Sequence, residues 1–325
     1  MCSVVVRYNG GEKSKRGLLR YRCPRCKETI SFSKKKTWKK KSFLYWFEKY
    51  ILGGVTYDVL SQWSHYSIQT LETSFHQLLS QNPPPLVLPD FLEEESYLLI
   101  DGLWFGKRTC LMLYRHSKEK IILYASFMGK ERGSRIAKDL KHLNKTHRFT
   151  GIVSDGGTGI RNAVFTVYGH IPHQICMAHL HRDIITAMGR YPKDYRVLQL
   201  KKIADHIWFI ESKEALNWWK DNLKKWIDRN RDFLREIKHL DTGGWWFIHK
   251  GVRKALRILV SLPDTSFKFL SHPLMPKTTN ELEGSISSIS GKHLIHRGLK
   301  RERVVSFVSW FIYFYNRKLI SQRKN

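Results

Sequence analysis

The 325-residue sequence lacks the long apolar segments of a membrane protein. No run of about 18 residues is free of polar side chains, so we expect no membrane-spanning helix and no membrane partner. No signal peptide is evident at its start. Cysteine is scarce and odd in number, with only Cys2, Cys23, Cys26, Cys110 and Cys176. This argues against a disulfide-stabilised fold and favours a reducing compartment such as the cytoplasm.

Acidic residues are also scarce relative to basic ones. The chain has 28 Asp and Glu against 57 Lys and Arg, and its formal net charge is +29. This excess is larger than solubility requires, and it predicts a polyanionic partner, of which nucleic acid is the usual example. A solvated basic surface without a ligand is the simpler alternative.

Residues 1–42 form a strongly basic arm, with 14 Lys or Arg and two acids. Within it, Cys23 and Cys26 are spaced as in a zinc knuckle, where two thiolates lie on one tight turn. Cys2 is a third candidate ligand for zinc. A tetrahedral site needs a fourth, so the site is short of one ligand or the coding start lies further upstream. A basic disordered arm is the alternative, and either version binds phosphate.

Residues 43–82 predict a helix-turn-helix region. Three short helices are expected at about 43–54, 56–63 and 68–79, with a turn near residues 64–66. The third helix would then read the DNA major groove. A plain helical linker bundle is the alternative. The sequence Asn-Pro-Pro-Pro at 82–85 predicts a domain boundary.

From residue 90 to 325 the pattern indicates an α/β domain. Strands are expected at 97–105, 109–115 and 120–127, joined by short links into an antiparallel meander. A helix at 134–143, a strand at 149–155, a helix at 158–167 and a strand at 173–176 follow. This order is that of the ribonuclease H fold, in which the first and fourth strands are neighbours.

Two of these strands end on an aspartate. Asp101 closes the first strand, and Asp155 closes the fourth and is followed by Gly156 and Gly157. Carboxylates at the ends of neighbouring strands lie where α/β folds bind ligands. Two of them can share a divalent cation, because Mg²⁺ prefers carboxylate oxygens, water and phosphate.

A third acid lies in the sequence TTNELEG at 278–284, which contains Glu281 and Glu283. Asn280 can cap a helix there, with Glu283 three residues later as in a capping box. Glu281 follows Thr278 by the same interval. Helix capping alone therefore explains either glutamate, and the residue pattern leaves the choice open.

Further candidates for binding surround these acids. Cys176 and His179 are spaced to hold zinc, but no second pair is evident, so we expect Cys176 to end a buried strand and His179 to contact DNA or the carboxylates. The full set of predicted DNA-binding residues is Cys176, His179, His181, Arg182, Lys292, His296 and Arg297.

Residues 178–262 have helical periodicity and predict an all-α insertion. They contain six of the 11 Trp residues, which at this spacing predict core packing. Trp245 and Trp246 follow two glycines and have an alternative place on a loop against DNA.

The motifs LLIDGLWF, IVSDGGTGI, QICMAHLHRDI and TTNELEG occur in this order along most of the chain. Together they resemble the DDE transposases of the Mutator-like superfamily, which includes bacterial insertion-sequence enzymes. The resemblance implies an RNase H-like catalytic domain with an all-α insertion, preceded by a zinc-ribbon-like arm and a helix-turn-helix. It implies the triad Asp101, Asp155 and Glu283, with Glu283 preferred over Glu281, and two Mg²⁺ or Mn²⁺ ions. The missing first cysteine of the zinc ribbon is a departure.

The activity implied by this resemblance is binding to the ends of a mobile DNA element, followed by strand cleavage and strand transfer. Two ends must be brought together, so a homo-oligomer on DNA in a bacterial cytoplasm is expected. An RNase H-like nuclease without strand transfer shares all three acids and is one alternative. An inactive, transposase-derived DNA-binding protein is the other.

Overall fold

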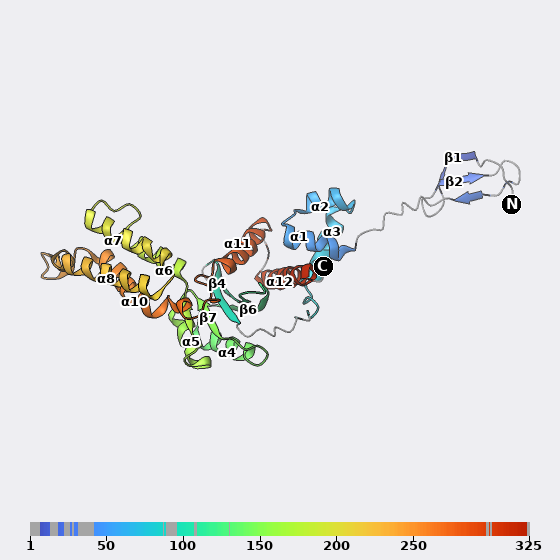
Figure 1. Ribbon diagram of the computed structural model, residues 1–325. Coiled ribbons are helices and arrows are strands. Elements are labelled where there is room, and N and C mark those ends of the chain that lie inside the picture. The colour runs from blue at the N-terminus through green and yellow to red at the C-terminus, as the bar shows by residue number, and fades with distance from the viewer. Residues whose placement is uncertain are drawn as a thin grey trace. The chain divides into compact units, whose positions relative to one another are not determined.

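The computed structural model describes residues 7–13, 19–22, 27, 29–31, 42–86, 88, 96–106, 109–129, 131–296, 299 and 301–323 (Figure 1). The chain divides into two compact units, Met1–Phe47 and Glu48–Asn325. Within the described ranges, no helix combines the length and the apolar character needed to cross a membrane.

The first unit contains a small antiparallel sheet. Its strands are β1 (Arg7–Lys13), β2 (Leu19–Arg22) and β3 (Thr29–Ser31), paired in that order. The predicted zinc ligands Cys2, Cys23 and Cys26 lie outside the described residues, so zinc binding stays a prediction.

Three short helices follow, at the positions predicted from the sequence. They are α1 (Phe43–Gly53), α2 (Tyr57–Ser64) and α3 (Ile68–Leu79). His65, with a φ of 58°, ends α2, and the Ser67 side chain caps α3 by accepting a hydrogen bond from the backbone N–H of Thr70. The rings of Tyr50 and Phe75, 5.2 Å apart, belong to the small core of this bundle.

A five-stranded mixed sheet carries the rest of the second unit. Its strands are β4 (Tyr97–Phe105), β5 (Thr109–His116), β6 (Ile122–Met128), β7 (Gly151–Ser154) and β8 (His173–Ile175), in the spatial order β6-β5-β4-β7-β8. The β4–β5 and β5–β6 pairs are antiparallel, and β4–β7 and β7–β8 are parallel. The predicted adjacency of the first and fourth strands is confirmed, and the sheet is consistent with an RNase H-like DDE domain.

Both faces of the sheet are covered, which explains why β4 and β5 are apolar almost throughout. Helices α4 (Gly133–Leu143) and α5 (Thr158–Tyr168) lie side by side on one face (Figure 1). Side chains such as Ile136, Leu140 and Ile160 form a core there with Leu98 and Ile100 of β4. The other face is in contact with α11 (Asn280–Ile295) and α12 (Arg301–Arg323).

Helix α12 joins the sheet to the α1–α3 bundle. The Asn316 side chain accepts a hydrogen bond from the backbone N–H of Ile122 at 3.0 Å and donates one to its carbonyl at 2.8 Å. Further along α12, the Trp310 indole N–H donates to the carbonyls of Leu78 and Gln81, both at 3.1 Å. These bonds satisfy buried polar groups of segments more than 190 residues apart in sequence.

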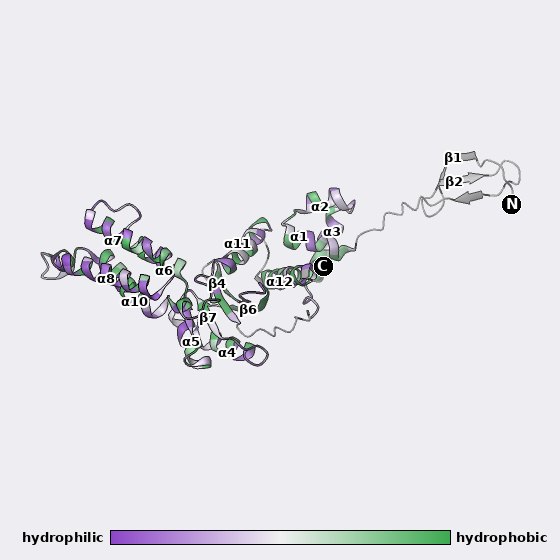
Figure 2. Ribbon diagram, viewed as in Figure 1, coloured by the Kyte–Doolittle hydropathy of each residue, from purple (hydrophilic) through white to green (hydrophobic). Residues whose placement is uncertain are grey.

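A mainly helical segment lies between β8 and α11. It comprises α6 (Met177–Met188), α7 (Tyr195–Asp205), the 3-10 helix η1 (His206–Phe209), α8 (Lys213–Arg229), α9 (Arg231–Arg235), α10 (Lys250–Thr265) and the 3-10 helix η2 (Lys268–Leu270). Figure 2 shows hydrophilic and hydrophobic residues side by side on α6, α7, α8 and α10, as expected of helices that bury one face. Trp219 and Trp226 are buried, as predicted, whereas Trp218 is 57% exposed.

The expectation of an all-α insertion is wrong at one point. Strands β9 (Ile237–His239) and β10 (Trp245–Phe247) form an antiparallel hairpin. Aromatic and β-branched residues favour strands, and Gly243, with a φ of 85°, turns the chain between them. Trp245 and Trp246 therefore lie on a strand, with Trp245 56% exposed.

Candidate active site

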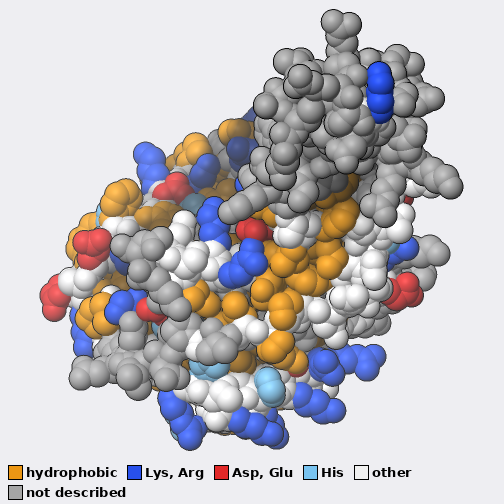
Figure 3. Space-filling view, turned by 90° about the vertical axis from the view of Figure 1, so that its right-hand side faces the viewer, with side chains coloured by type: hydrophobic (Ala, Val, Ile, Leu, Met, Phe, Trp, Pro, Cys, Tyr) orange, Lys and Arg blue, Asp and Glu red, His pale blue; other side chains and the backbone are white. Residues whose placement is uncertain are grey.

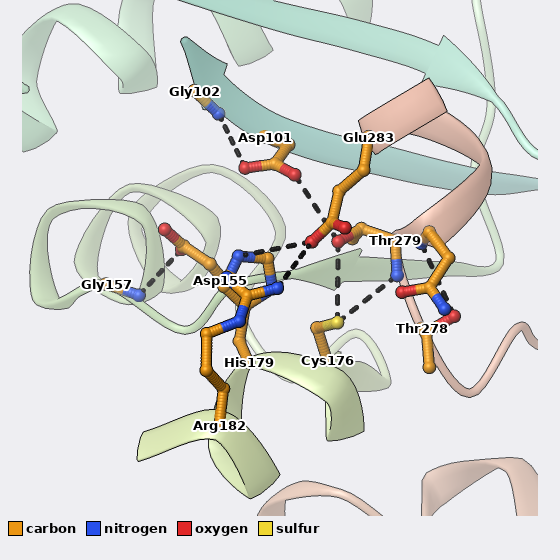
Figure 4. A network of polar contacts seen from close by, with 11 residues as sticks. Asp101, Gly102, Asp155, Gly157, Cys176, His179, Arg182, Thr278, Thr279 and Glu283 are labelled. Atoms are coloured by element: carbon orange, nitrogen blue, oxygen red, sulfur yellow. Dashed lines mark hydrogen bonds and ion pairs between the residues drawn. The ribbon is translucent and has the colours of Figure 1, made fainter. Parts of the chain in front are cut away.

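Asp101 lies in the middle of β4, on the face of the sheet that α11 covers, so the expectation that it ends this strand is wrong. Only 5% of the residue is exposed. One carboxylate oxygen accepts a hydrogen bond from the N–H of Gly102 at 2.8 Å, and the other accepts one from the Thr279 hydroxyl at 3.4 Å (Figure 4). Burial, together with the negative charges of Asp155 and Glu283, raises the pKa of Asp101 to about 6.

Asp155 lies next to Asp101 at the end of the neighbouring strand. The parallel register pairs Ile100 with Ser154, so the aspartates are the next residues on the two strands. Gly156, with a φ of 80°, then turns the chain towards α5. The carboxylate of Asp155 points towards Gly157 and accepts its N–H at 2.9 Å (Figure 4).

Glu283 reaches the same place from the first turn of α11. Its carboxylate oxygen Oε1 lies 3.5 Å from Nε2 of His179 and 3.4 Å from an Nη atom of Arg182. Glu281 points elsewhere, to Arg115 at 3.3 Å, and its side chain is 55% exposed.

Helix capping does not account for Glu283. The N-cap of α11 is Thr279, so the third helical position is Leu282 and Glu283 is one residue too late for a capping box. The position of Glu283 is explained instead by its contacts with the groups around Asp101.

Cys176 and His179 lie at the start of α6, next to Thr279 and Glu283. The sulfur of Cys176 accepts hydrogen bonds from the N–H and the hydroxyl of Thr279, at 3.3 and 3.4 Å. Burial raises the pKa of the Cys176 thiol, but hydrogen bonds from His179 and Thr279 outweigh burial, and the net shift is downward. The hydrogen bond to Cys176 is also the largest cause that raises the pKa of His179, to about 9.

Three of these side chains converge closely enough to hold one cation. Among the described residues, ligand atoms of Asp101, His179 and Glu283 all lie within 4.8 Å of one another. Two carboxylates and an imidazole are a suitable donor set for a divalent metal ion. Asp155 lies beside this group, but its carboxylate is directed at Gly157 (Figure 4).

Comparison with known proteins identifies the family of the chain. Residues 106–293, more than half of the chain, match the family described as Transposase IS66 family. The chain belongs to the IS66 family of transposases. It is a DDE transposase, so its activity is DNA transposition, its partner is DNA, and its chemistry involves divalent metal ions. No curated protein matches the chain.

The assignment to the Mutator-like superfamily is therefore wrong, because the matching family is a different one. The error has a physical origin. Two-metal phosphodiester chemistry on an RNase H-like sheet needs carboxylates that lie close together on neighbouring strands. Short motifs of this kind specify the chemistry and the fold, and they do not separate families that share both.

The IS66-family transposase has one more carboxylate here, which sequence reasoning missed. Glu131 lies between β6 and α4, and burial followed by the charges of Asp155 and Asp101 raises its pKa. A Cβ atom built on Gly157 would lie 3.0 Å from Oε1 of Glu131 and 3.4 Å from Oδ1 of Asp155. The only sequence signal is an acid between the third strand and the next helix, and many surface loops have one.

The remaining predicted DNA contacts of the transposase differ in their surroundings. The side chain of Arg182 is 60% exposed, and His181 is bonded to Asp205 at 2.8 Å. Lys292 donates to the carbonyl of Gly53 at 3.2 Å.

His296 is a less favourable candidate. It is 8% exposed, and its Nε2 lies 2.9 Å from the carbonyl oxygen of Tyr50. Its ring also lies 3.8 Å from that of Tyr50. A role for His296 in DNA contact stays a prediction, and its geometry favours packing. Arg297 lies outside the described residues.

Proposed function

We propose that Asp101, Asp155 and Glu283 are the catalytic triad of this transposase and hold its divalent metal ions, Mg²⁺ or Mn²⁺. The observation that carries the proposal is the parallel pairing of β4 with β7. It aligns the two aspartates on adjacent strands, where α11 brings in Glu283. Glu283 is favoured over Glu281, because Glu281 is engaged by Arg115 outside the cluster.

His179 is the fourth member of the proposed site. Its Nε2 faces Glu283, and the imidazole is close enough to share one cation with Asp101 and Glu283. Only the neutral imidazole is a ligand, so His179 gives up its proton when it binds a metal ion. The Thr279 hydroxyl can donate a hydrogen bond to Asp101 or to Cys176. Its position between them links β4 to the start of α6.

The chemistry supplied by two bound divalent ions is activation of a water or a 3′-OH and stabilisation of the leaving oxygen in an in-line displacement. The side chains themselves provide no nucleophile. We propose that the same site first cleaves at the element end and then transfers the freed 3′ end to target DNA.

Other parts of the chain are proposed to bind DNA. Helices α2 and α3 are separated by a three-residue turn, His65–Ser67, as in a helix-turn-helix, and this supports a DNA-reading role for residues 43–82. The net charge of +29 supports contact with the phosphate backbone, and Figure 3 shows Lys and Arg side chains along the lower edge of one face. We propose that residues 1–42 are a zinc-ribbon-like arm and that the protein acts as a homo-oligomer on DNA.

The test is cleavage and joining of DNA that carries the ends of the insertion sequence, with Mg²⁺ or Mn²⁺. We expect wild type and Glu281→Gln to cut and join, and Asp155→Asn and Glu283→Gln to bind the same DNA without reaction. Glu281→Gln is a matched control, because it makes the same change two residues away. Activity in Glu283→Gln would contradict the third acid. Cutting without joining by wild type would favour a simple nuclease, and binding alone an inactive DNA-binding protein.

A further inference from the structure

Glu131 is held beside the active site by a contact between two glycines. A Cβ atom on Gly133, at the start of α4, would lie 2.9 Å from the carbonyl oxygen of Gly159 in α5. Only glycine permits so close an approach without a shift of the backbone. The two helix starts therefore meet, and the backbone that leads into α4 carries Glu131 towards the end of β7.

The space between Glu131 and Asp155 is kept open by a third glycine. Gly157 donates its N–H to Asp155, and a Cβ atom there would crowd the Glu131 carboxylate and touch that of Asp155. Its φ of −50° is one that every residue adopts, so backbone strain does not require glycine at this position. The absence of a side chain instead leaves the two carboxylates facing the same small volume.

The charges in this volume are not balanced by the protein residues that the structure describes. Among them, no Lys, Arg or His forms an ion pair with Glu131 or Asp155, although many such pairs occur elsewhere in the unit. Burial raises the pKa of the Cys110 thiol to about 12, and the charges of Glu131, Asp155 and Asp101 add to this effect. The charges of all three carboxylates therefore reach the Cys110 side chain of β5.

We propose that Glu131 is a fourth acidic ligand of the transposase, which holds a second divalent cation together with Asp155 and Asp101. Asp101 would then be shared between this position and the group of Asp101, His179 and Glu283. Asp155 points away from Glu283, and this assignment makes Glu131 the carboxylate with which it shares a cation. Oxygen-only ligands suit Mg²⁺ or Mn²⁺ at this position. The inference rests on the proposed function, because it extends the same site.

The experiment is a Mn²⁺ titration of the full chain, in which electron paramagnetic resonance counts the free ion. We expect two Mn²⁺ per chain for wild type and for Glu211→Gln, a control whose side chain is 81% exposed. Glu131→Gln should keep one ion with unchanged affinity and bind the other at least about tenfold more weakly. Asp101→Asn should weaken both. Glu131→Asp, which keeps the carboxylate, should recover the second ion at higher Mn²⁺.

A thermal unfolding measurement separates a ligand from a merely structural residue. Without metal, Glu131→Gln removes repulsion from Asp155 and Asp101, so its Tm should equal or exceed that of wild type. Added Mn²⁺ should raise the Tm of wild type more than that of the variant. A lower Tm without metal, or two ions bound as in wild type, would overturn the role of Glu131 while leaving the proposed triad intact. If Asp101→Asn binds Mn²⁺ as wild type does, the proposed triad itself fails.

Discussion

Replacing Gly157 by Ala should separate metal binding from stability. The φ of Gly157 is −50°, so alanine fits the backbone. Gly157 is the N-cap of α5, where alanine costs about 0.5–1 kcal/mol relative to glycine. Alanine also lowers the conformational entropy of the unfolded chain, which stabilises the folded state by about 0.4–1 kcal/mol and offsets this cost. We therefore expect the free energy of unfolding to stay within about 0.5 kcal/mol of wild type.

The new methyl group should nevertheless disturb the site. It would lie 3.0 Å from Oε1 of Glu131, which is closer than ordinary contact, and 3.4 Å from Oδ1 of Asp155, which is an ordinary contact distance. Glu131 has the more flexible side chain and should move away. We expect Mn²⁺ affinity to fall about tenfold, and DNA cleavage to fall with it, because a misplacement of about 1 Å in such a site can cost about 100-fold in rate.

The neighbouring Gly156→Ala is the matched comparison. Gly156 has a φ of 80°, and its Cβ would lie 2.5 Å from Cγ2 of Ile175. A left-handed conformation and a core clash should together cost about 2–4 kcal/mol. Urea denaturation of both variants, with Mn²⁺ binding and end-DNA cleavage measured in parallel, tests the reasoning. It is refuted if Gly157→Ala unfolds as easily as Gly156→Ala, or if it binds Mn²⁺ and cuts DNA like wild type.

Three further predictions concern stability, measured by urea denaturation. Burial lowers the pKa of His173 to about 4, below the value of about 6.5 in the unfolded chain, so its contribution is complete above pH 6.5 and is lost as pH falls towards 4. Wild type should lose about 2 kcal/mol between pH 7 and pH 5 that His173→Gln does not lose. Asn316→Leu leaves the backbone N–H and C=O of Ile122 unpaired and should cost about 2–4 kcal/mol. Trp219→Phe removes a buried indole that donates a hydrogen bond at 2.8 Å and should cost about 2 kcal/mol, whereas the exposed Trp218→Phe should cost little.

Each of these has a clear contrary result. Equal pH slopes in wild type and His173→Gln would mean that protonation of His173 does not oppose folding. Ser321→Ala lies on an exposed part of α12 and should change stability by less than about 0.5 kcal/mol. If Asn316→Leu behaves like Ser321→Ala, the link between α12 and β6 contributes nothing. Equal losses for Trp218→Phe and Trp219→Phe would contradict the burial argument.

The sheet and two of its carboxylates were predictable from the sequence. Apolar runs that stop at Asp101 and Asp155 mark both positions, although β4 continues past Asp101 to Phe105, and the order of strands and helices predicts that these strands are neighbours. Glu283 was harder, because capping explains either glutamate of this motif equally well. The choice depends on where α11 begins, and that is set by tertiary contacts of Thr279 with Asp101 and Cys176.

Other features depend on packing that no local pattern reveals. Glu131 reaches the site only because Gly133 and Gly159 let α4 and α5 meet. His296 belongs to a basic stretch in the sequence, yet it is buried through its contact with Tyr50, 246 positions away. The β9–β10 hairpin was hidden by helical periodicity on both sides of it.

Helix α12 has a consequence for how the protein is made. It bonds to Ile122 of the catalytic sheet and to Leu78 and Gln81 beside α3, and it is translated after both. On the ribosome, the bonds of α12 to the α1–α3 bundle and to the sheet therefore cannot form until residues 301–323 emerge. The partial chain has Asp101 and Asp155, the proposed catalytic aspartates, before it has the helix that bonds the sheet to the proposed DNA reader. The bonds of α12 therefore form only after both of the segments that they join have been made.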